Sequence, residues 1–295
     1  MLYHRKTYKN LFKYGLCYTY EVIKVCIMEI IKYILLGLIQ GITEIFPISS
    51  SGHLVLFQRL FGLNEPGLVF EMFTNTASFL ALFVLFYKDI FRLIQGFFGY
   101  LFSKEKQKYQ DDFVYVMKLL IAIVPIGIVG FAFKDTMGSI KNLLTVGISL
   151  MVTGTLLLTI FFTRHAIVDH DEITFKDALL IGFTQAFAIF PGISRSGSTI
   201  IGGRSSRVSL KSILKFSFLA YIIISVPTSI LGFYDLSKVT VIINWLGYSL
   251  AFVMTFLTTF LTGYLVMKKL KVDHMLYFGI YCFIVGLVSL LVFFL

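Results

Sequence analysis

Three ionisable residues lie in or between long apolar stretches of this 295-residue chain. Glu44 and His53 lie on either side of a Ser-rich break that begins at Pro47, and Arg195 lies inside a second break that begins at Pro191. A charge or a titratable group within an apolar, membrane-type segment is costly, and it usually marks a functional site. Each of the three is therefore a candidate site residue.

Both breaks have the composition of an anion-binding site. In each, a Ser- and Gly-rich turn precedes a short apolar arm, at Ser49–Gly52 and at Ser194–Thr199. A turn of this kind that leads into a helix presents free backbone N–H groups and the positive end of the helix dipole. Serine hydroxyls add donors, and the guanidinium of Arg195 adds a fork that matches two phosphate oxygens.

The first break also offers groups for proton transfer. Glu44 and His53 form an acid/base pair that we expect within reach of one point, and Ser50 or a neighbour supplies a potential nucleophile. Gln40 precedes Glu44 by four residues, so both lie on one face of a helix. Together the breaks predict a phosphate-binding, proton-transferring site whose natural substrate is a phosphate ester or anhydride on a lipid.

The composition indicates a membrane protein. Hydrophobic residues make up 57% and charged residues 14% of the chain, and the mean hydropathy is +0.85. Soluble domains carry roughly 45–50% apolar and about 25% charged residues, so a soluble enzyme is excluded, as are disorder and a disulfide scaffold. The net charge of +10 suits anionic lipid headgroups or an anionic substrate, and we expect no nucleic acid partner.

Hydropathy predicts an all-α polytopic protein with six transmembrane helices. They are expected near Leu68–Tyr87, Phe113–Phe133, Leu143–Thr163, Ser212–Phe233, Trp245–Met267 and Met275–Leu295. Two further stretches, Ile30–Phe61 and Ala178–Gly203, contain the breaks and have arms of about 8–16 residues, fewer than the roughly 20 that a crossing needs. We interpret them as re-entrant helical hairpins, with ordinary kinked spans as the alternative.

The two broken stretches resemble each other. Five residues of the first recur 145 positions later in the second: Gly37, Gln40, Ser49, Ser51 and Gly52 recur as Gly182, Gln185, Ser194, Ser196 and Gly197. Three predicted spans separate the two hairpins, and an odd number of crossings inverts the second with respect to the first. The sequence therefore predicts an inverted-topology repeat, with halves at about 28–163 and 176–295, whose breaks meet near the bilayer midplane.

Loop charges predict the orientation, with one conflict. Thirteen Lys and Arg residues fall in loops on one predicted side and four on the other, which places the first side in the cytoplasm and the C-terminus outside. The basic residues of segment 1–27 would then lie outside. We take 1–27 as a doubtful N-terminal extension, with Met28 as the natural start of a single membrane domain, 28–295. A genuine interfacial segment is the alternative.

At these breaks the chain resembles the undecaprenyl-diphosphate phosphatase family of the bacitracin-resistance type. One motif is an (E/Q)xxxE box followed by PxSSxGH, here Gln40-Gly-Ile-Thr-Glu44-Ile-Phe-Pro47-Ile-Ser-Ser-Ser-Gly-His53. The other is PGxSRSGxT, here Pro191-Gly-Ile-Ser-Arg-Ser-Gly-Ser-Thr199. The resemblance extends from about Met28 to the C-terminus.

The resemblance implies hydrolysis of undecaprenyl diphosphate to undecaprenyl phosphate and inorganic phosphate, which recycles the lipid carrier for cell-wall synthesis and confers bacitracin resistance. It implies a bacterial plasma membrane protein with an outward-facing site, membrane lipids around it and a homodimer as one open oligomeric state. It implies catalytic roles for Glu44, His53, Ser50 and Arg195, and substrate-binding roles for Gln40, Ser49, Ser51, Ser194, Ser196 and Thr199.

The resemblance also implies a divalent cation, Mg²⁺ or Ca²⁺, for which Glu44 is the evident ligand. Gln40 is the neutral variant of the first box, so it cannot act as a general base. An account with two carboxylates loses one member here, which weakens metal binding by this box.

Two other functions remain open from the sequence. Inverted repeats with broken helices are transporter architecture, so a polyprenyl-phosphate transporter or flippase is the main alternative. A phosphatase of the phosphatidic-acid-phosphatase type ranks lower, because its KxxxxxxRP box and its second histidine are both absent from the sequence.

Overall fold

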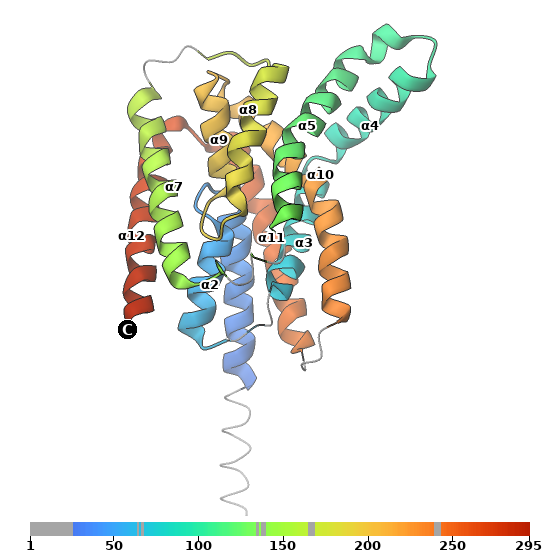
Figure 1. Ribbon diagram of the computed structural model, residues 1–295. Helices are drawn as coiled ribbons and strands as arrows, with labels where there is room; N and C mark the ends of the chain where they lie inside the picture. The colour runs from blue at the N-terminus through green and yellow to red at the C-terminus, as the bar shows by residue number, and fades with distance from the viewer. Residues whose placement is uncertain are drawn as a thin grey trace, which may run out of the picture.

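The computed structural model describes residues 26–63, 65, 68–133, 136, 140–164, 169–238 and 243–295. These residues fold almost entirely into helices (Figure 1). After a first helix at Cys26–Ile45, the longer helices are α2 (Ser50–Phe61), α3 (Val69–Leu85), α4 (Tyr87–Phe102), α5 (Lys106–Ala132), α7 (Leu143–Thr163), α8 (Phe175–Ala186), α9 (Arg195–Ser205), α10 (Leu210–Ser237), α11 (Trp245–Lys269) and α12 (Met275–Phe294).

Six of these helices are long and apolar enough to cross a membrane. They are the helices Cys26–Ile45, Lys106–Ala132, Leu143–Thr163, Leu210–Ser237, Trp245–Lys269 and Val272–Phe294, the last of which includes a short 3-10 turn. Many of their large apolar side chains are exposed on the outside of the bundle, as expected where lipid replaces water. The protein is an all-helical membrane protein, which confirms the predicted class.

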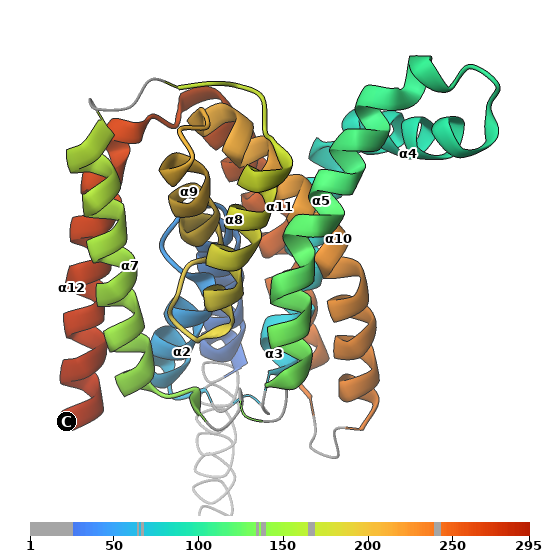
Figure 2. The same cartoon turned by 45° about the horizontal axis from the view of Figure 1, so that its top comes forward.

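The expected span at Leu68–Tyr87 is shorter and bent. Helix α3 has 17 residues, and the chain then turns by 78° into α4. Charges follow the bend directly, at Lys88, Asp89 and Arg92, so the apolar run of α3 cannot continue as one straight crossing. Helix α4 instead packs against the beginning of α5 (Figures 1 and 2).

The first arm of the first broken stretch is longer than the sequence suggested. It is a helix of 20 residues, Cys26–Ile45, and not an arm too short to cross. The sequence suggests a shorter arm because Glu29 interrupts the apolar run, so that the arm is counted from Ile30. In the structure Glu29 is exposed near the helix end, where a charge is tolerated. Residues 1–25, which include most of the doubtful extension, lie outside the described residues.

The two breaks lie close together inside the bundle. Helix α8 runs from one end of the molecule to its middle, where an irregular loop leads into α9, which returns beside α8 toward the same end (Figures 1 and 2). The loop approaches the start of α2, since the backbone N–H of Gly192 donates to Ser51 Oγ at 3.4 Å. Two segments about 145 residues apart therefore build one region.

The first repeated glycine, Gly37 in the first broken stretch and Gly182 in the second, makes an equivalent helix–helix contact in each. A Cβ atom on Gly37 would lie 2.3 Å from the carbonyl oxygen of Ala251 in α11, and one on Gly182 would lie 2.5 Å from that of Ala122 in α5. Both glycines thus let two helix backbones approach, which is how helices associate in membranes. These contacts hold the helix that precedes each break firmly against a long neighbour.

Candidate active site

Helices α2 and α9 begin with the same serine cap. Ser49 Oγ accepts from the backbone N–H of Gly52 at 3.3 Å, and Ser194 Oγ accepts from that of Gly197 at 3.1 Å. A serine at this position satisfies one of the free donors of a helix N-terminus. Both helices have their positive ends at the breaks, as an anion site requires.

A direct hydrogen bond joins the start of α9 to the first break. Ser196 Oγ donates to the backbone oxygen of Phe46 at 3.0 Å, next to the first break. On the other side, Thr153 of α7 lies 3.4 Å from the N–H of Ser194 and from the oxygen of Gly192, and it steadies the second break. The relative position of the two N-termini is therefore fixed by the protein.

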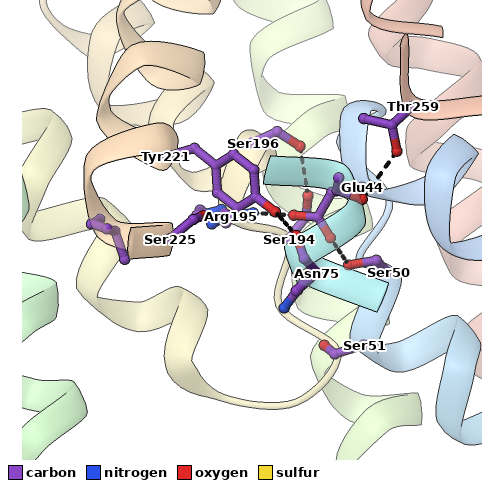
Figure 3. A network of polar contacts seen from close by, with 12 residues as sticks. Glu44, Ser50, Ser51, Asn75, Ser194, Arg195, Ser196, Tyr221, Ser225 and Thr259 are labelled. Carbon is purple, nitrogen blue, oxygen red and sulfur yellow. Dashed lines mark hydrogen bonds and ion pairs between the residues drawn. The ribbon is translucent and has the colours of Figure 1, made fainter. Parts of the chain in front are cut away.

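Glu44 is the centre of the polar network in Figure 3. One carboxylate oxygen forms an ion pair with Arg195, and the other accepts from Ser50 Oγ at 2.5 Å and from Gln40 Nε2 at 2.9 Å. Only 4% of its side chain is exposed, and such a buried carboxylate needs these partners to remain charged. The structure thus brings together four predicted site residues from both breaks.

Arg195 is held on two sides and open on a third. Its guanidinium carbon lies 3.7 Å from the ring centroid of Tyr221 in α10, and one nitrogen binds Glu44. The Tyr221 hydroxyl donates to the backbone oxygen of Asn75 at 3.1 Å, which fixes the ring. Because 24% of the Arg195 side chain is exposed, an anion can reach it. Stacking on an aromatic ring leaves the edge of the guanidinium available for bidentate bonds.

Gln40 links the network to α3. Its Nε2 donates to Asn75 Oδ1 at 3.0 Å as well as to Glu44, while its Oε1 is a buried acceptor without a hydrogen-bond partner among the described residues. Within that part of the chain, no group of three or more His, Cys, Asp or Glu side chains could hold a metal ion. One carboxylate and one free amide oxygen fit a Mg²⁺ ion that takes its remaining ligands from phosphates and water.

His53 does not contact Glu44, the residue with which the sequence suggested that it forms an acid/base pair. Its Nδ1 lies 2.7 Å from the backbone oxygen of Ser49, and its Nε2 lies 2.8 Å from the hydroxyl of Tyr281 in α12, on whose ring it also stacks. The ring is fully buried in these contacts. In the structure His53 therefore holds the first break against α12, and it has no contact with the Glu44 carboxylate.

Three of the predicted binding residues make structural contacts. Ser51 accepts from Gly192, and Ser194 caps α9. Thr199 Oγ1 donates to the backbone oxygen of Ser196 at 2.9 Å and lies 2.8 Å from Ser217 Oγ in α10, so it joins α9 to a neighbour. These contacts hold the two breaks and α9 in position around the site.

Sequence reasoning missed two aromatic partners, and it assigned no role to the amide of Asn75. Tyr221 and Tyr281 lie in apolar spans where nothing in the local pattern distinguishes them from lipid-facing aromatics. Asn75 could have been found, since an amide in the middle of an apolar stretch requires a partner just as a charge does. Its partner is Gln40.

Fold and site together define a class: an all-helical membrane protein in which two helix N-termini converge on a buried carboxylate, a hydroxyl and a guanidinium. The family model described as "Bacitracin resistance protein BacA" matches residues 33–288. The chain belongs to this family.

Relatives of known name agree with the family model. An undecaprenyl-diphosphatase of Acholeplasma laidlawii is 46% identical over 272 residues, which are 90% of this chain and 97% of the relative. An undecaprenyl-diphosphatase of Oceanobacillus iheyensis is 38% identical over 89% of this chain and 96% of its own length. A Bacillus thuringiensis protein named undecaprenyl-diphosphatase 2 is 39% identical over 89% of this chain.

Proposed function

We propose that this protein is an undecaprenyl-diphosphatase, which hydrolyses undecaprenyl diphosphate to undecaprenyl phosphate and inorganic phosphate. The observation that carries the mechanism is the 2.5 Å hydrogen bond from Ser50 Oγ to the Glu44 carboxylate. A hydroxyl at the positive end of a helix, with a carboxylate to accept its proton, is an activated nucleophile. The 46% identity to a named relative supports the substrate.

Substrate binding would replace the contact between Arg195 and Glu44. The diphosphate has more negative charge than one carboxylate, and its oxygens can take both the guanidinium fork and the free N–H groups of α2 and α9. Tyr221 keeps the guanidinium in place during this exchange. The exchange frees one oxygen of Glu44 next to the reacting hydroxyl.

The chemical step would begin at Ser50. Its oxygen attacks the terminal phosphorus while Glu44 accepts its proton, and the anhydride bond breaks to release undecaprenyl phosphate. A water molecule then hydrolyses the phosphoserine and releases inorganic phosphate. A water in place of the serine hydroxyl, activated by the same carboxylate, is the alternative nucleophile. Fixed donors at the phosphoryl oxygens supply most of the stabilisation.

Glu44 and the free Oε1 of Gln40 would hold a divalent cation, together with oxygens of the diphosphate. Such an ion neutralises charge on the transferring phosphoryl group. His53 would act as a positioning residue, since its ring nitrogens contact Ser49 and Tyr281.

The finer architecture belongs to the same proposal. Each helix–break–helix segment turns back at its break and leaves on the side where it entered, as a re-entrant hairpin, although the first arm of the first segment is long enough to cross. The two hairpins form an inverted-topology repeat, and their breaks meet near the bilayer midplane. The matching caps and the matching glycine contacts support it. The site opens to the outer face of a bacterial plasma membrane, where the lipid carrier is recycled for cell-wall synthesis and bacitracin resistance arises. The proposal also includes a homodimer as the oligomeric state, which a sizing experiment in detergent tests.

The alternative function is transport of a polyprenyl phosphate. The similarity of the two broken segments favours it, because transporters use such pairs for alternating access. A transporter without hydrolase activity would release no phosphate in detergent, where no gradient exists.

The test is phosphate release from undecaprenyl diphosphate by the detergent-purified protein, with and without Mg²⁺, beside Arg195→Ala and Ser50→Ala. We expect release that requires Arg195, and acid-stable labelling of the wild type, but not of Ser50→Ala, when the terminal phosphate is radioactive. Release without labelling would assign the attack to water. No release from a monodisperse sample would favour the transporter, and the next test would be flipping of a polyprenyl phosphate in liposomes.

A further inference from the structure

Helices α4 and the beginning of α5 form an arm that leaves the bundle (Figures 1 and 2). The arm is held together by close contacts of glycines. A Cβ atom on Gly96 would lie 2.3 Å from Cβ of Asp112, and one on Gly99 would lie 2.8 Å from the ring of Tyr109. Because α4 is bent by 78° from α3, it runs nearly across the direction of the span that precedes it.

The face of α4 that points away from α5 is apolar and exposed. Its side chains recur at three- and four-residue spacing, which places them in one stripe: Phe91, Ile94, Phe98 and Leu101. The opposite face, with Leu93 and Gly96, is buried. In both overall views α4 forms the lower side of the arm and the polar beginning of α5 forms its upper side.

Positive charge lines the edge of this stripe and the tip of the arm. Lys88 and Arg92 lie one turn apart on one flank of α4, Lys104 lies in the turn between the two helices, and Lys106 and Lys108 lie in the first turn of α5. The acidic residues Asp89 and Asp112 are paired with Lys215 and Arg92. The remaining acidic residues of the arm are Glu105 and Asp111, against four lysines.

We propose that α4 lies in the plane of the membrane surface, with its apolar stripe among the acyl chains and its lysines bound to anionic phospholipid headgroups. An amphipathic helix with Phe and Leu on one face and lysines beside it has the composition of a surface-lying segment. Each lysine near an anionic leaflet contributes to the attraction. The order of the two helices across the arm agrees with this position, because α4 would face the acyl chains and the polar start of α5 would face water.

The occupant of the surface follows from the charge. An apolar stripe alone would suit any lipid, whereas lysines at its edge and tip select headgroups with net negative charge. A protein partner on the same stripe would shield it from lipid, so the two differ in one measurable property. This inference is independent of the proposed hydrolysis.

The test uses quenching of tryptophan fluorescence by brominated lipids. The chain has a single tryptophan, so the substitution Phe98→Trp in a Trp245→Phe background gives a reporter in α4 alone. In proteoliposomes we expect brominated phosphatidylglycerol to bind beside this α4 reporter about three- to fivefold more strongly than brominated phosphatidylcholine. The triple variant K104Q/K106Q/K108Q should lose this preference.

Two controls make the result specific. The triple variant K268Q/K269Q/K271Q removes three lysines at the end of α11 and just after it, and it should leave the preference at the α4 reporter unchanged. A reporter at the exposed Phe131 of α5, made as Phe131→Trp, should show no preference. Weak quenching of the α4 reporter by both lipids would place the arm away from the bilayer, and strong quenching without a headgroup preference would remove the role of the lysines. Either outcome would overturn the proposal.

Discussion

Ser50 and Arg195 occupy the same position in their helices, 145 residues apart, and both bind the carboxylate of Glu44. Around them the two breaks agree in detail. The serine before each caps the helix, and the third residue after each bonds back to that serine's backbone oxygen, through His53 Nδ1 at 2.7 Å and through Ser198 Oγ at 2.9 Å. The scaffold is duplicated, whereas the reacting groups are not.

The halves differ where chemistry needs different groups. Gln40 donates to Glu44, but its counterpart Gln185 is followed by no carboxylate, and its Nε2 is a buried donor without a partner among the described residues. One half thus supplies the carboxylate and the hydroxyl, and the other supplies the guanidinium of Arg195. A single centre built from two similar helix starts needs each functional group only once.

The largest effect is expected when the unique carboxylate is removed. Glu44→Gln keeps the size of the side chain but loses the proton acceptor for Ser50, so phosphate release should fall about 10³-fold. Asp177→Asn is the matched control, because this buried carboxylate in α8 caps its helix through Thr174. It should cost about 1 kcal/mol of stability and leave turnover of the folded protein unchanged. Equal losses of turnover in both variants would contradict a special role of Glu44.

Arg195→Lys should have the next largest effect. Lysine keeps the charge but loses the fork and the stacking on Tyr221, so kcat/KM should fall about 10²-fold, mainly through KM. Arg204→Lys changes a buried guanidinium at the other end of the same helix, where it binds Asp169 at 2.6 Å. It should lower the melting temperature without raising KM. A similar KM in both variants would mean that charge alone suffices at position 195.

The sequence predicted which residues meet, and it failed where a contact depends on distant packing. The repeat and the serine spacing were enough to expect Glu44, Ser50 and Arg195 in one place. Spacing alone also suggested His53 beside Glu44, but the ring follows the helix geometry of α2 toward Tyr281, 228 residues away. After the bend, α4 packs against α5 through close contacts of Gly96 and Gly99, which hydropathy does not report.

The second break is one residue longer than the first between its proline and its capping serine, and the backbone conformations differ accordingly. Pro47 is separated from the capping serine by one residue, whereas Pro191 is separated from it by two, and the extra residue is Gly192 with a φ of 95°. Without that glycine, the first break places the positive φ of 68° on the cap residue Ser49 itself. The second cap, Ser194, has an ordinary extended conformation.

Gly192→Ala should therefore destabilise the protein strongly. The new Cβ would lie 2.8 Å from the backbone oxygen of Val146, in a conformation that alanine disfavours, so we expect a loss of about 2 kcal/mol. Gly127→Ala in α5 is the control, since no atom of another segment among the described residues lies within 4 Å of its Cβ position, and it should stabilise the helix slightly. Thermal unfolding in detergent measures both, and equal melting temperatures would show that the second break tolerates a side chain.

The smallest expected effect is a difference in stability between glycine variants of the two capping serines. Both Ser49→Gly and Ser194→Gly lose a capping hydroxyl and add chain entropy to the unfolded state, which together cost about 1 kcal/mol. At position 49 glycine also relieves a positive φ, worth about 1 kcal/mol, so that variant should unfold near the wild-type temperature while Ser194→Gly unfolds lower. The difference between the two melting temperatures measures the strain at the first break alone. If Ser49→Gly is as unstable as Ser194→Gly, the cap residue of α2 carries no strain, and the extra glycine of the second break serves only the contact with α7.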